Sequence, residues 1–292
     1  MASEVDGAPT RATTALLTVA ALIAFAGNSL LCRLALTRTS IDAASFTTIR
    51  IASGAMALLL IVRLRPGPRH TGGSWPSALA LMVYAAGFSF AYVRLTAGTG
   101  ALLLFGAVQA TMITVGVIRG ERLSPLQTCG LLLAYAGLVD LVLPGITAPP
   151  VISAALMISA GIAWGVYSLR AKGAGDPTAV TAGNFVRAVP MALLVSVLAL
   201  SIRSVNAAGA MFAITSGALA SGVGYAVWYT ALRDLRATTA ATVQLSVPVI
   251  AAIGGITLLH EPLTSRLLLS AAAILGGVAL VVLTRTTRQV LE

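Results

Sequence analysis

Residues 99–118 read TGALLLFGAVQATMITVGVI, a run without a single charged residue, and the polar stretch RGERLSP follows at residues 119–125. A hydrocarbon core about 30 Å thick needs roughly 20 apolar residues of helix to cross it, because each residue rises about 1.5 Å. This run therefore predicts a membrane-spanning helix that ends in a short polar turn.

Nine further runs of this kind bring the expected number of spans to ten. The spans are predicted at residues 13–36, 42–62, 75–95, 99–118, 124–143, 151–170, 178–202, 209–232, 238–259 and 264–284. Their apolar residues are continuous rather than alternating, which excludes a β-barrel. No gap between them is long enough for a soluble domain. The predicted fold class is an all-α membrane protein with ten transmembrane helices.

The composition supports a lipid environment and excludes several classes of protein. Of the 292 residues 58% are hydrophobic and 10% are charged, whereas soluble domains have about 25% charged residues. The single lysine, Lys172, does not stand in a Walker phosphate loop. His70, His260, Cys32 and Cys129 lack the spacing of zinc ligands or of a disulfide framework. We expect no cofactor, no metal and no enzymatic activity.

The net charge of +10 comes from arginines that stand singly at the ends of apolar runs. Such placement is typical of topology markers rather than of a nucleic-acid-binding patch. With the N-terminus inside, the inner side carries twelve basic residues: Arg11, Arg63, Arg65, Arg69, Arg119, Arg122, Arg170, Lys172, Arg233, Arg236, Arg285 and Arg288. The outer side carries five: Arg33, Arg38, Arg94, Arg203 and Arg266. The positive-inside rule thus predicts cytoplasmic tails at residues 1–12 and 285–292.

The two halves of the chain resemble each other. A shift of 137 residues places Arg33 on Arg170 and Arg50 on Arg187, and a shift of 140 residues continues the match further along. Each half holds five spans, and because five is odd, the second half must cross the membrane in the opposite sense. Inverted repeats of this kind are typical of alternating-access transporters.

The predicted repeats are residues 13–143 and 151–284, and each contains a glutamate–leucine turn. GERLSP at residues 120–125 is followed by glycines 130 and 137, and HEPLT at residues 260–264 is followed by glycines 276 and 277. These turns resemble those of the ten-helix EamA-type branch of the drug/metabolite transporter superfamily, and within it the YddG-type exporters. The resemblance implies a carrier in the bacterial inner membrane that exports amino acids, aromatic ones included, and related metabolites.

Aromatic side chains near mid-span are candidates for the substrate cavity. Tyr84 and Phe88 are four residues apart and share one helical face, and Tyr225 has the equivalent register in the second half. Trp164 lies between Gly161 and Gly165, a spacing that lets a neighbouring helix approach closely. These rings would stack on a substrate; helix packing and an interfacial aromatic belt are the alternatives, the belt above all for Tyr92, Trp228 and Tyr229.

Amide side chains within the spans should point away from lipid, because polar groups in hydrocarbon are costly. Asn28, Gln109 and Gln244 are the candidate substrate contacts, and Gln109 and Gln244 lie in corresponding spans. The alternative is a hydrogen bond between helices, worth about 1 kcal/mol. Asn184 is expected to point inward as well.

Three residues are candidates for a kink or a gate. Pro248 removes a backbone hydrogen bond in span nine and should bend it. Arg50 and Arg187 occupy matched positions and are expected to snorkel toward the interface as structural or gating charges. Glu121 and Glu261 are expected to cap the last helix of each half.

The expected mechanism is alternating access around a cavity lined by spans one, three, four, six, eight and nine, with spans five and ten at the periphery. The only acid within a span is Asp140, so a proton relay lacks a carboxylate and facilitated export is favoured. A proton-coupled exporter of small cationic drugs is the alternative. The expected partners are a small-molecule substrate and the lipid bilayer, with no nucleic acid and with the oligomeric state left open.

Overall fold

A computed structural model describes residues 11–65, 71–145, 148–171 and 173–289, and within these ranges the chain is helical throughout, apart from short turns. Arg69, His70 and Lys172, together with most of the two tails, lie outside the described residues. The first half contains α1 (Arg11–Arg38), α2 (Ala43–Leu64), α3 (Trp75–Tyr92), α4 (Ala97–Ile118) and α5 (Pro125–Val142).

The second half contains more elements because two of its spans are divided. They are α6 (Val151–Ala171), α7 (Pro177–Leu198), η1 (Leu200–Ile202), α8 (Ala207–Ile214), η2 (Thr215–Val223), α9 (Gly224–Leu232), α10 (Ala237–Gln244), α11 (Ser246–Leu259) and α12 (Ser265–Gln289). The segment η2 is a π-helix that joins α8 to α9 without a turn. The all-helical fold class is confirmed.

Among the described residues, nine helical segments are long and apolar enough to cross a membrane. They correspond to nine of the ten expected spans, with α8, η2 and α9 forming one segment and α10 and α11 contributing another. The remaining expected span, residues 75–95, is α3, whose 18 residues are not among the nine. The prediction of a multi-pass membrane protein is confirmed, and the number of ten transmembrane helices stays a prediction.

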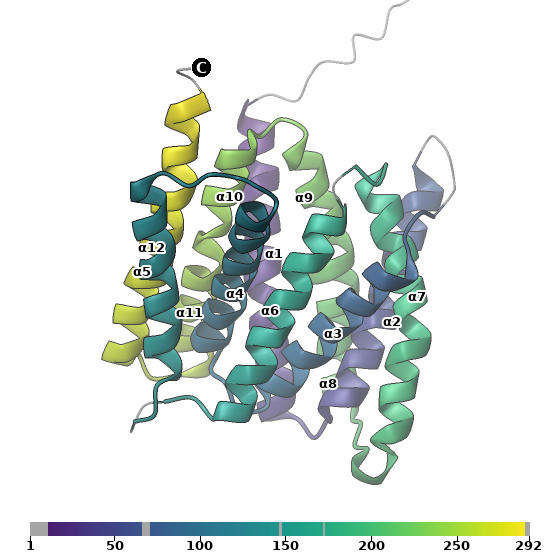
Figure 1. Cartoon of the computed structure of the whole chain (residues 1–292). Helices are drawn as coiled ribbons and strands as arrows, with labels where there is room; N and C mark the ends of the chain where they lie inside the picture. The colour runs from purple at the N-terminus through teal and green to yellow at the C-terminus, as the bar shows by residue number, and fades with distance from the viewer. Residues whose placement is uncertain (1–10, 66–70, 146–147, 172, 290–292) are drawn as a thin grey trace, which may run out of the picture.

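The helices form one bundle in which the start of α1 and the end of α12 lie at the same end (Figure 1). We call this the terminal end and the opposite one, where α1 ends and α4 begins, the distal end. α5 and α12 pack side by side at one edge, as expected for the peripheral spans, and α2 packs with α7 at the other (Figure 1). Each of these pairs joins counterpart spans of the predicted repeat.

Small residues bring α6 close to α4. A Cβ at Gly161 would lie 2.6 Å from the Cβ of Ala107, and one at Gly165 would lie 2.9 Å from the Cβ of Thr111. The Gly161–Gly165 pair therefore packs against a helix as the sequence predicts. This contact fixes the turn of α6 that carries Trp164.

The ninth predicted span is interrupted at Leu245, between α10 and α11. Pro248 has no N–H to donate to the carbonyl of Gln244. At the interruption, Leu245 donates its N–H to the backbone oxygen of Thr242, three residues earlier, at 3.1 Å. This interruption lies three residues before Pro248, and the bend itself stays a prediction. Pro190, by contrast, lies inside α7 without interrupting it.

Candidate functional site

A cavity of about 320 Å³ lies between the two halves of the bundle. Its walls come from α1, α3, α4, α6, α9 and α10, with single residues from η2 and α7, so the spans expected to line it do so. The lining residues are Phe25, Asn28, Ser29, Tyr84, Phe88, Leu104, Phe105, Val108, Met112, Trp164, Tyr167, Ser168, Ala171, Pro177, Ala220, Tyr225, Trp228, Tyr229, Leu232 and Gln244. Ala171, Pro177 and Leu232 lie at helix ends, so the cavity reaches the terminal end.

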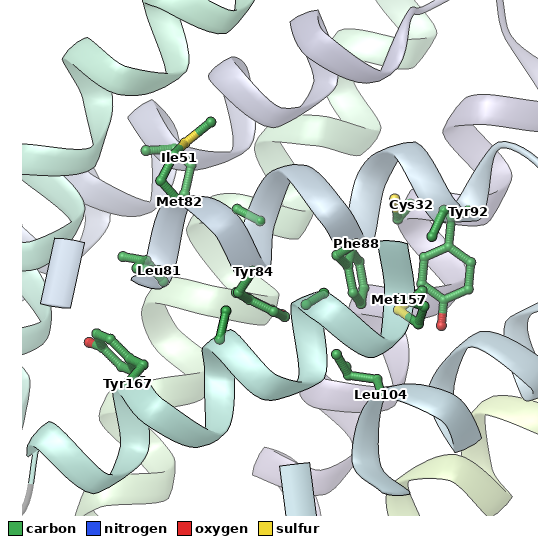
Figure 2. Close-up of a cluster of buried hydrophobic side chains, with 14 of the residues drawn as sticks. Cys32, Ile51, Leu81, Met82, Tyr84, Phe88, Tyr92, Leu104, Met157 and Tyr167 are labelled. Atoms are coloured by element: carbon green, nitrogen blue, oxygen red, sulfur yellow. The ribbon is translucent and has the colours of Figure 1, made fainter. Parts of the chain in front are cut away.

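Trp164 stands at the centre of the aromatic wall. Its ring centroid lies 4.8 Å from that of Tyr84 and 5.4 Å from that of Tyr225, which is nearly parallel to it. Tyr84 and Phe88 follow one another along α3, facing α6 (Figure 2). Four aromatic residues that the sequence places in three separate spans thus meet around one cavity.

Two further rings in this wall were not predicted as substrate contacts. Tyr167 stacks on Trp164 with centroids 5.1 Å apart, and Phe25 contacts Tyr225 at 5.6 Å. Tyr167 follows Trp164 by three residues and so shares its helical face, a signal the sequence already contains. Trp228 and Tyr229 also line the cavity rather than forming only an interfacial belt.

The amides separate into two groups. Asn28 and Gln244 line the cavity, Gln244 at the break in span nine, whereas Gln109 is buried in α4 and is not a lining residue. Asn28 accepts a hydrogen bond from Ser216 and donates one to the Tyr84 hydroxyl at 3.4 Å. Asn184 is buried too, where it donates to Tyr167 at 3.3 Å.

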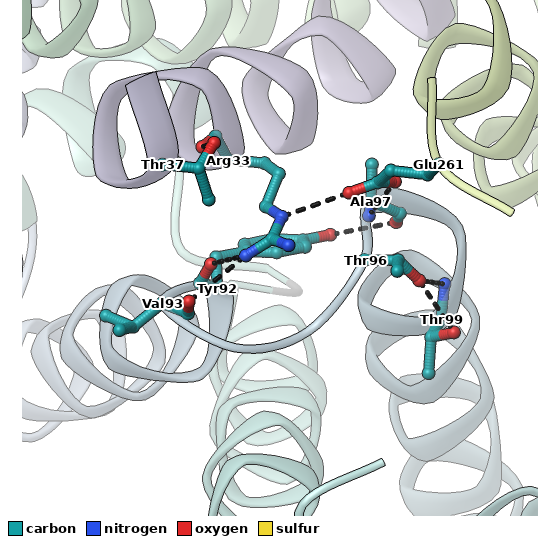
Figure 3. Close-up of polar contacts among 8 residues, drawn as sticks. All are labelled: Arg33, Thr37, Tyr92, Val93, Thr96, Ala97, Thr99 and Glu261. Carbon is teal, nitrogen blue, oxygen red and sulfur yellow. Dashed lines mark hydrogen bonds and ion pairs between the residues drawn. The ribbon is translucent and has the colours of Figure 1, made fainter. Parts of the chain in front are cut away.

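Polar contacts join three segments of the chain beyond the distal end of the cavity (Figure 3). Arg33 pairs with Glu261, Nε to Oε1, at 3.0 Å, and its Nη1 donates to the backbone oxygens of Tyr92 and Val93. The other carboxylate oxygen of Glu261 accepts the backbone N–H of Ala97 at 2.7 Å. These contacts join α1, the α3–α4 turn and the turn after α11, one helical turn beyond the lining residues Ser29 and Phe88.

The role expected for Glu261 needs correction. It was predicted to cap the last helix of its half, but it accepts from the first residue of α4. In the first half, Ser124 and Gln127 form the capping box of α5, so Glu121 does not supply that cap.

The two matched arginines also differ from expectation. Arg50 is only 1% exposed and donates its Nη2 to the Tyr84 hydroxyl at 2.9 Å, so it does not snorkel to the interface. It is enclosed because its guanidinium packs on the rings of Tyr84 and Phe88. Arg187 is half-buried and donates its Nη1 to the backbone oxygens of Gly72 and Gly183, each at 2.9 Å.

Comparison with known proteins agrees with this architecture. Residues 151–283 match the EamA-like transporter family. An uncharacterized protein of Pseudomonas aeruginosa is 54% identical over 96% of this chain and 98% of its own length. An uncharacterized transporter of Archaeoglobus fulgidus is 26% identical over 80% of this chain and 85% of its own length.

A solved structure titled only "Crystal structure of protein" has a similar fold. It aligns with a TM-score of 0.62 over 94% of this chain and 99% of its own, at 16% sequence identity. The chain belongs to the EamA-like transporter family of the drug/metabolite transporter superfamily, and it is a multi-pass membrane transporter.

Proposed function

We propose that this protein exports amino acids, aromatic ones among them, and related small metabolites across the bacterial inner membrane. The observation that carries the proposal is the cavity between the two halves. Stacked rings of Trp164, Tyr84 and Tyr225 offer faces to a flat or apolar side chain, and the amides of Asn28 and Gln244 offer hydrogen bonds to a polar group. Pockets with mostly apolar walls and a few polar groups suit small metabolites.

The transport mechanism we propose is alternating access. The positive-inside rule assigns the terminal end to the cytoplasm. The cavity reaches that end, while the Arg33–Glu261 pair closes the distal end. On this proposal, substrate enters the cavity from the cytoplasm, and export requires the distal contacts to separate while the terminal end closes.

We further propose that export is facilitated rather than proton-driven. None of the lining residues described above is an aspartate, a glutamate or a histidine, so a proton carrier in contact with the substrate is missing from this set. The competing proposal is a proton-coupled exporter of small cationic drugs. The aromatic wall favours it, because electron-rich ring faces attract cations.

Counterflow in proteoliposomes tests these proposals. Liposomes loaded with unlabelled amino acid should take up the labelled one transiently, with no requirement for a pH gradient. Trp164→Ala and Gln244→Ala should each lower the rate by roughly tenfold, since each removes a wall group worth about 1.4 kcal/mol. Gln109→Ala is the matched control, because Gln109 is an amide in the corresponding span that does not line the cavity.

Exchange of cations alone, coupled to proton movement, would favour the drug exporter. If the protein exchanges no solute from a panel of amino acids, sugars and cations, the proposal that it is a carrier is contradicted.

A further inference from the structure

Arg50 is the largest side chain that the described part of the protein buries completely. Its Nη2 donates to the Tyr84 hydroxyl at 2.9 Å, but its Nε and Nη1 have no hydrogen-bond partner. Among the described residues no carboxylate pairs with it. A positive charge is therefore enclosed about two turns from the distal start of α2 without an anion.

Other arginines within the spans do not share this situation. Arg187, the counterpart of Arg50 in the second half, donates to two backbone oxygens and is only half-buried. Arg33 is paired with Glu261. Unsatisfied charged donors in a membrane interior are costly, so burial of the Arg50 guanidinium with two unpaired nitrogens lowers the stability of this state of the protein. An anion that reaches the guanidinium in another step of the transport cycle would remove it.

The guanidinium lies one side-chain layer from the cavity. Its central carbon is 5.2 Å from the ring centroid of Tyr84 and 4.7 Å from that of Phe88, and both rings line the cavity. The Tyr84 hydroxyl accepts from Arg50 and also from Asn28, another lining residue. A rotation of these two rings would expose the charge to a solute at the distal end of the cavity.

The surroundings of Arg50 contain a second unusual feature. η2 packs so closely on α2 that a Cβ at Gly217 would overlap the backbone oxygen of Arg50. π-helical segments are frequent at functional sites. Ser221, on the same segment, holds the third unsatisfied buried side-chain atom among the described residues. The unsatisfied polar groups thus belong to the two elements that meet behind the aromatic wall.

We propose that Arg50 binds a carboxylate of the transported solute as the solute moves from the cavity toward the distal end. This proposal rests on the proposed function and narrows its substrate class to carboxylates with an apolar or aromatic body. The body stays against Trp164 and Tyr225, while the carboxylate takes the place that the rings of Tyr84 and Phe88 now occupy on the guanidinium. Charge-assisted hydrogen bonds from Arg50 to the carboxylate then hold the solute.

The first test uses the unmodified protein. The solute that exchanges fastest in counterflow is compared, as a competitor, with its own amide and its decarboxylated amine; for phenylalanine these are phenylalaninamide and phenethylamine. The free carboxylate should compete roughly tenfold or more better than either, because the amide and the amine lack the anion. Equal competition, or a sugar or an amine as the best solute, overturns the proposal while leaving a carrier in place.

The second test uses variants. Arg50→Gln should raise the KM for the carboxylate roughly tenfold and abolish the preference over the amide, and Arg50→Lys should restore part of it. Arg187→Gln is the matched control and should keep the preference. Thermal stability in detergent confirms that each variant is folded, and the first test stands even if Arg50→Gln does not fold.

Two further results distinguish a failure of the proposed function from a failure of the assignment of Arg50. If the unmodified protein exchanges no solute at all, the proposed function fails, not the assignment of Arg50 alone. If exchange requires chloride and the carboxylate preference is absent, an inorganic anion occupies the position and the assignment is overturned.

Discussion

The distal and terminal ends of the molecule contain the same pair of residues in different arrangements. At the distal end, Arg33 and Glu261 are in contact at 3.0 Å, with side chains 18% and 10% exposed. At the terminal end, their counterparts are Arg170, which donates to Ser77 at 3.1 Å, and Glu121, whose side chain is exposed. Matching residues thus make different contacts at the two ends, and the proposed alternating access would require such an asymmetry.

Loss of the distal contact should have the largest effect. Glu261→Gln removes the charge that pairs with Arg33 in a partly buried ion pair. Its loss should cost more than the roughly 1 kcal/mol of an exposed pair and less than the roughly 3 kcal/mol of a fully buried one. We expect the distal end to open in a larger share of molecules, and the thermal stability in detergent to fall. Glu121→Gln, at the exposed counterpart, should change stability by less than about 0.5 kcal/mol.

Labelling of a cysteine in the cavity measures this opening. Ser168→Cys places a thiol in the wall, Cys129→Ser removes the exposed native thiol, and Cys32 is buried. A membrane-impermeant maleimide added from the distal side should label the Glu261→Gln protein faster than the parent. Equal rates in the Glu261→Gln and Glu121→Gln proteins would show that the two glutamates do not differ in function.

Helix packing provides the next comparison between the halves. Gly161→Ala in α6 forces a Cβ to within 2.6 Å of Ala107 and should cost about 1–3 kcal/mol through overpacking. Gly27→Ala in α1, the counterpart helix, meets no atom within 4 Å and should be neutral or stabilising by up to about 1 kcal/mol. Thermal unfolding followed by circular dichroism in detergent distinguishes them; a similar loss in both variants would contradict the tight α4–α6 contact.

Removal of the helix break at Leu245 should have a smaller effect, and it should change transport only. In the 140-residue register Val108 of the unbroken α4 corresponds to Pro248. Pro248→Val restores a donor for the Gln244 carbonyl, so α10 and α11 should join and Gln244 should turn relative to the cavity. We expect the counterflow rate to fall by several-fold, at about 1 kcal/mol, with folding intact. An unchanged rate would make the break a static kink.

Removal of a helix cap at either end should give the smallest difference in stability between the two ends. Asp42 is the N-cap of α2 at the distal end, where its carboxylate accepts from the N–H groups of Ser45 and Ser204. Burial tends to raise the pKa of Asp42, but hydrogen bonds from Ser45, Ser204 and Ala44 outweigh it and lower the pKa. Because the folded-state pKa is lowered, this stabilisation is present above the unfolded value of 3.8 and is lost as pH falls through the folded value.

Asp42→Asn should therefore cost about 0.5–1 kcal/mol near pH 6 and reduce the fall in melting temperature between pH 5 and pH 3. Asp176, the N-cap of α7 at the terminal end, accepts from Thr178 alone among the described residues, so Asp176→Asn should cost less. An equal loss in both variants would show that the bond to Ser204 adds nothing.

Prediction from the sequence succeeded where a local pattern has a single physical solution. The spacing of Gly161 and Gly165 presents a smooth face, and α4 packs on it. A proline does not decide the local structure in the same way, because Pro248 follows an interruption of its helix whereas Pro190 lies in an unbroken one.

The expectation that Arg50 snorkels to the interface was wrong, because a long cationic side chain reaches either the interface or a neighbouring ring. Which of these it meets depends on Tyr84 and Phe88 of α3, which lie 34 and 38 residues further along the chain.

The closure of the distal end shows the same limit. The register paired Glu121 with Glu261, but it placed both at the start of the last helices. In the folded protein Glu261 reaches Arg33 and Ala97, which are more than 160 residues away in sequence. The polar groups around a glutamate in a turn are set by which other turns meet there, and no spacing within one segment encodes that.

By itself the sequence determined the solvent, the helices and their approximate ends, because the burial of apolar runs in lipid and the satisfaction of backbone hydrogen bonds are local requirements. Only the tertiary structure decided which rings face one cavity, where Arg33 and Glu261 meet, and that two nitrogens of the buried Arg50 have no acceptor. Two halves with matching residues satisfy the same local requirements in either an open or a closed arrangement, so the packing between helices makes the difference.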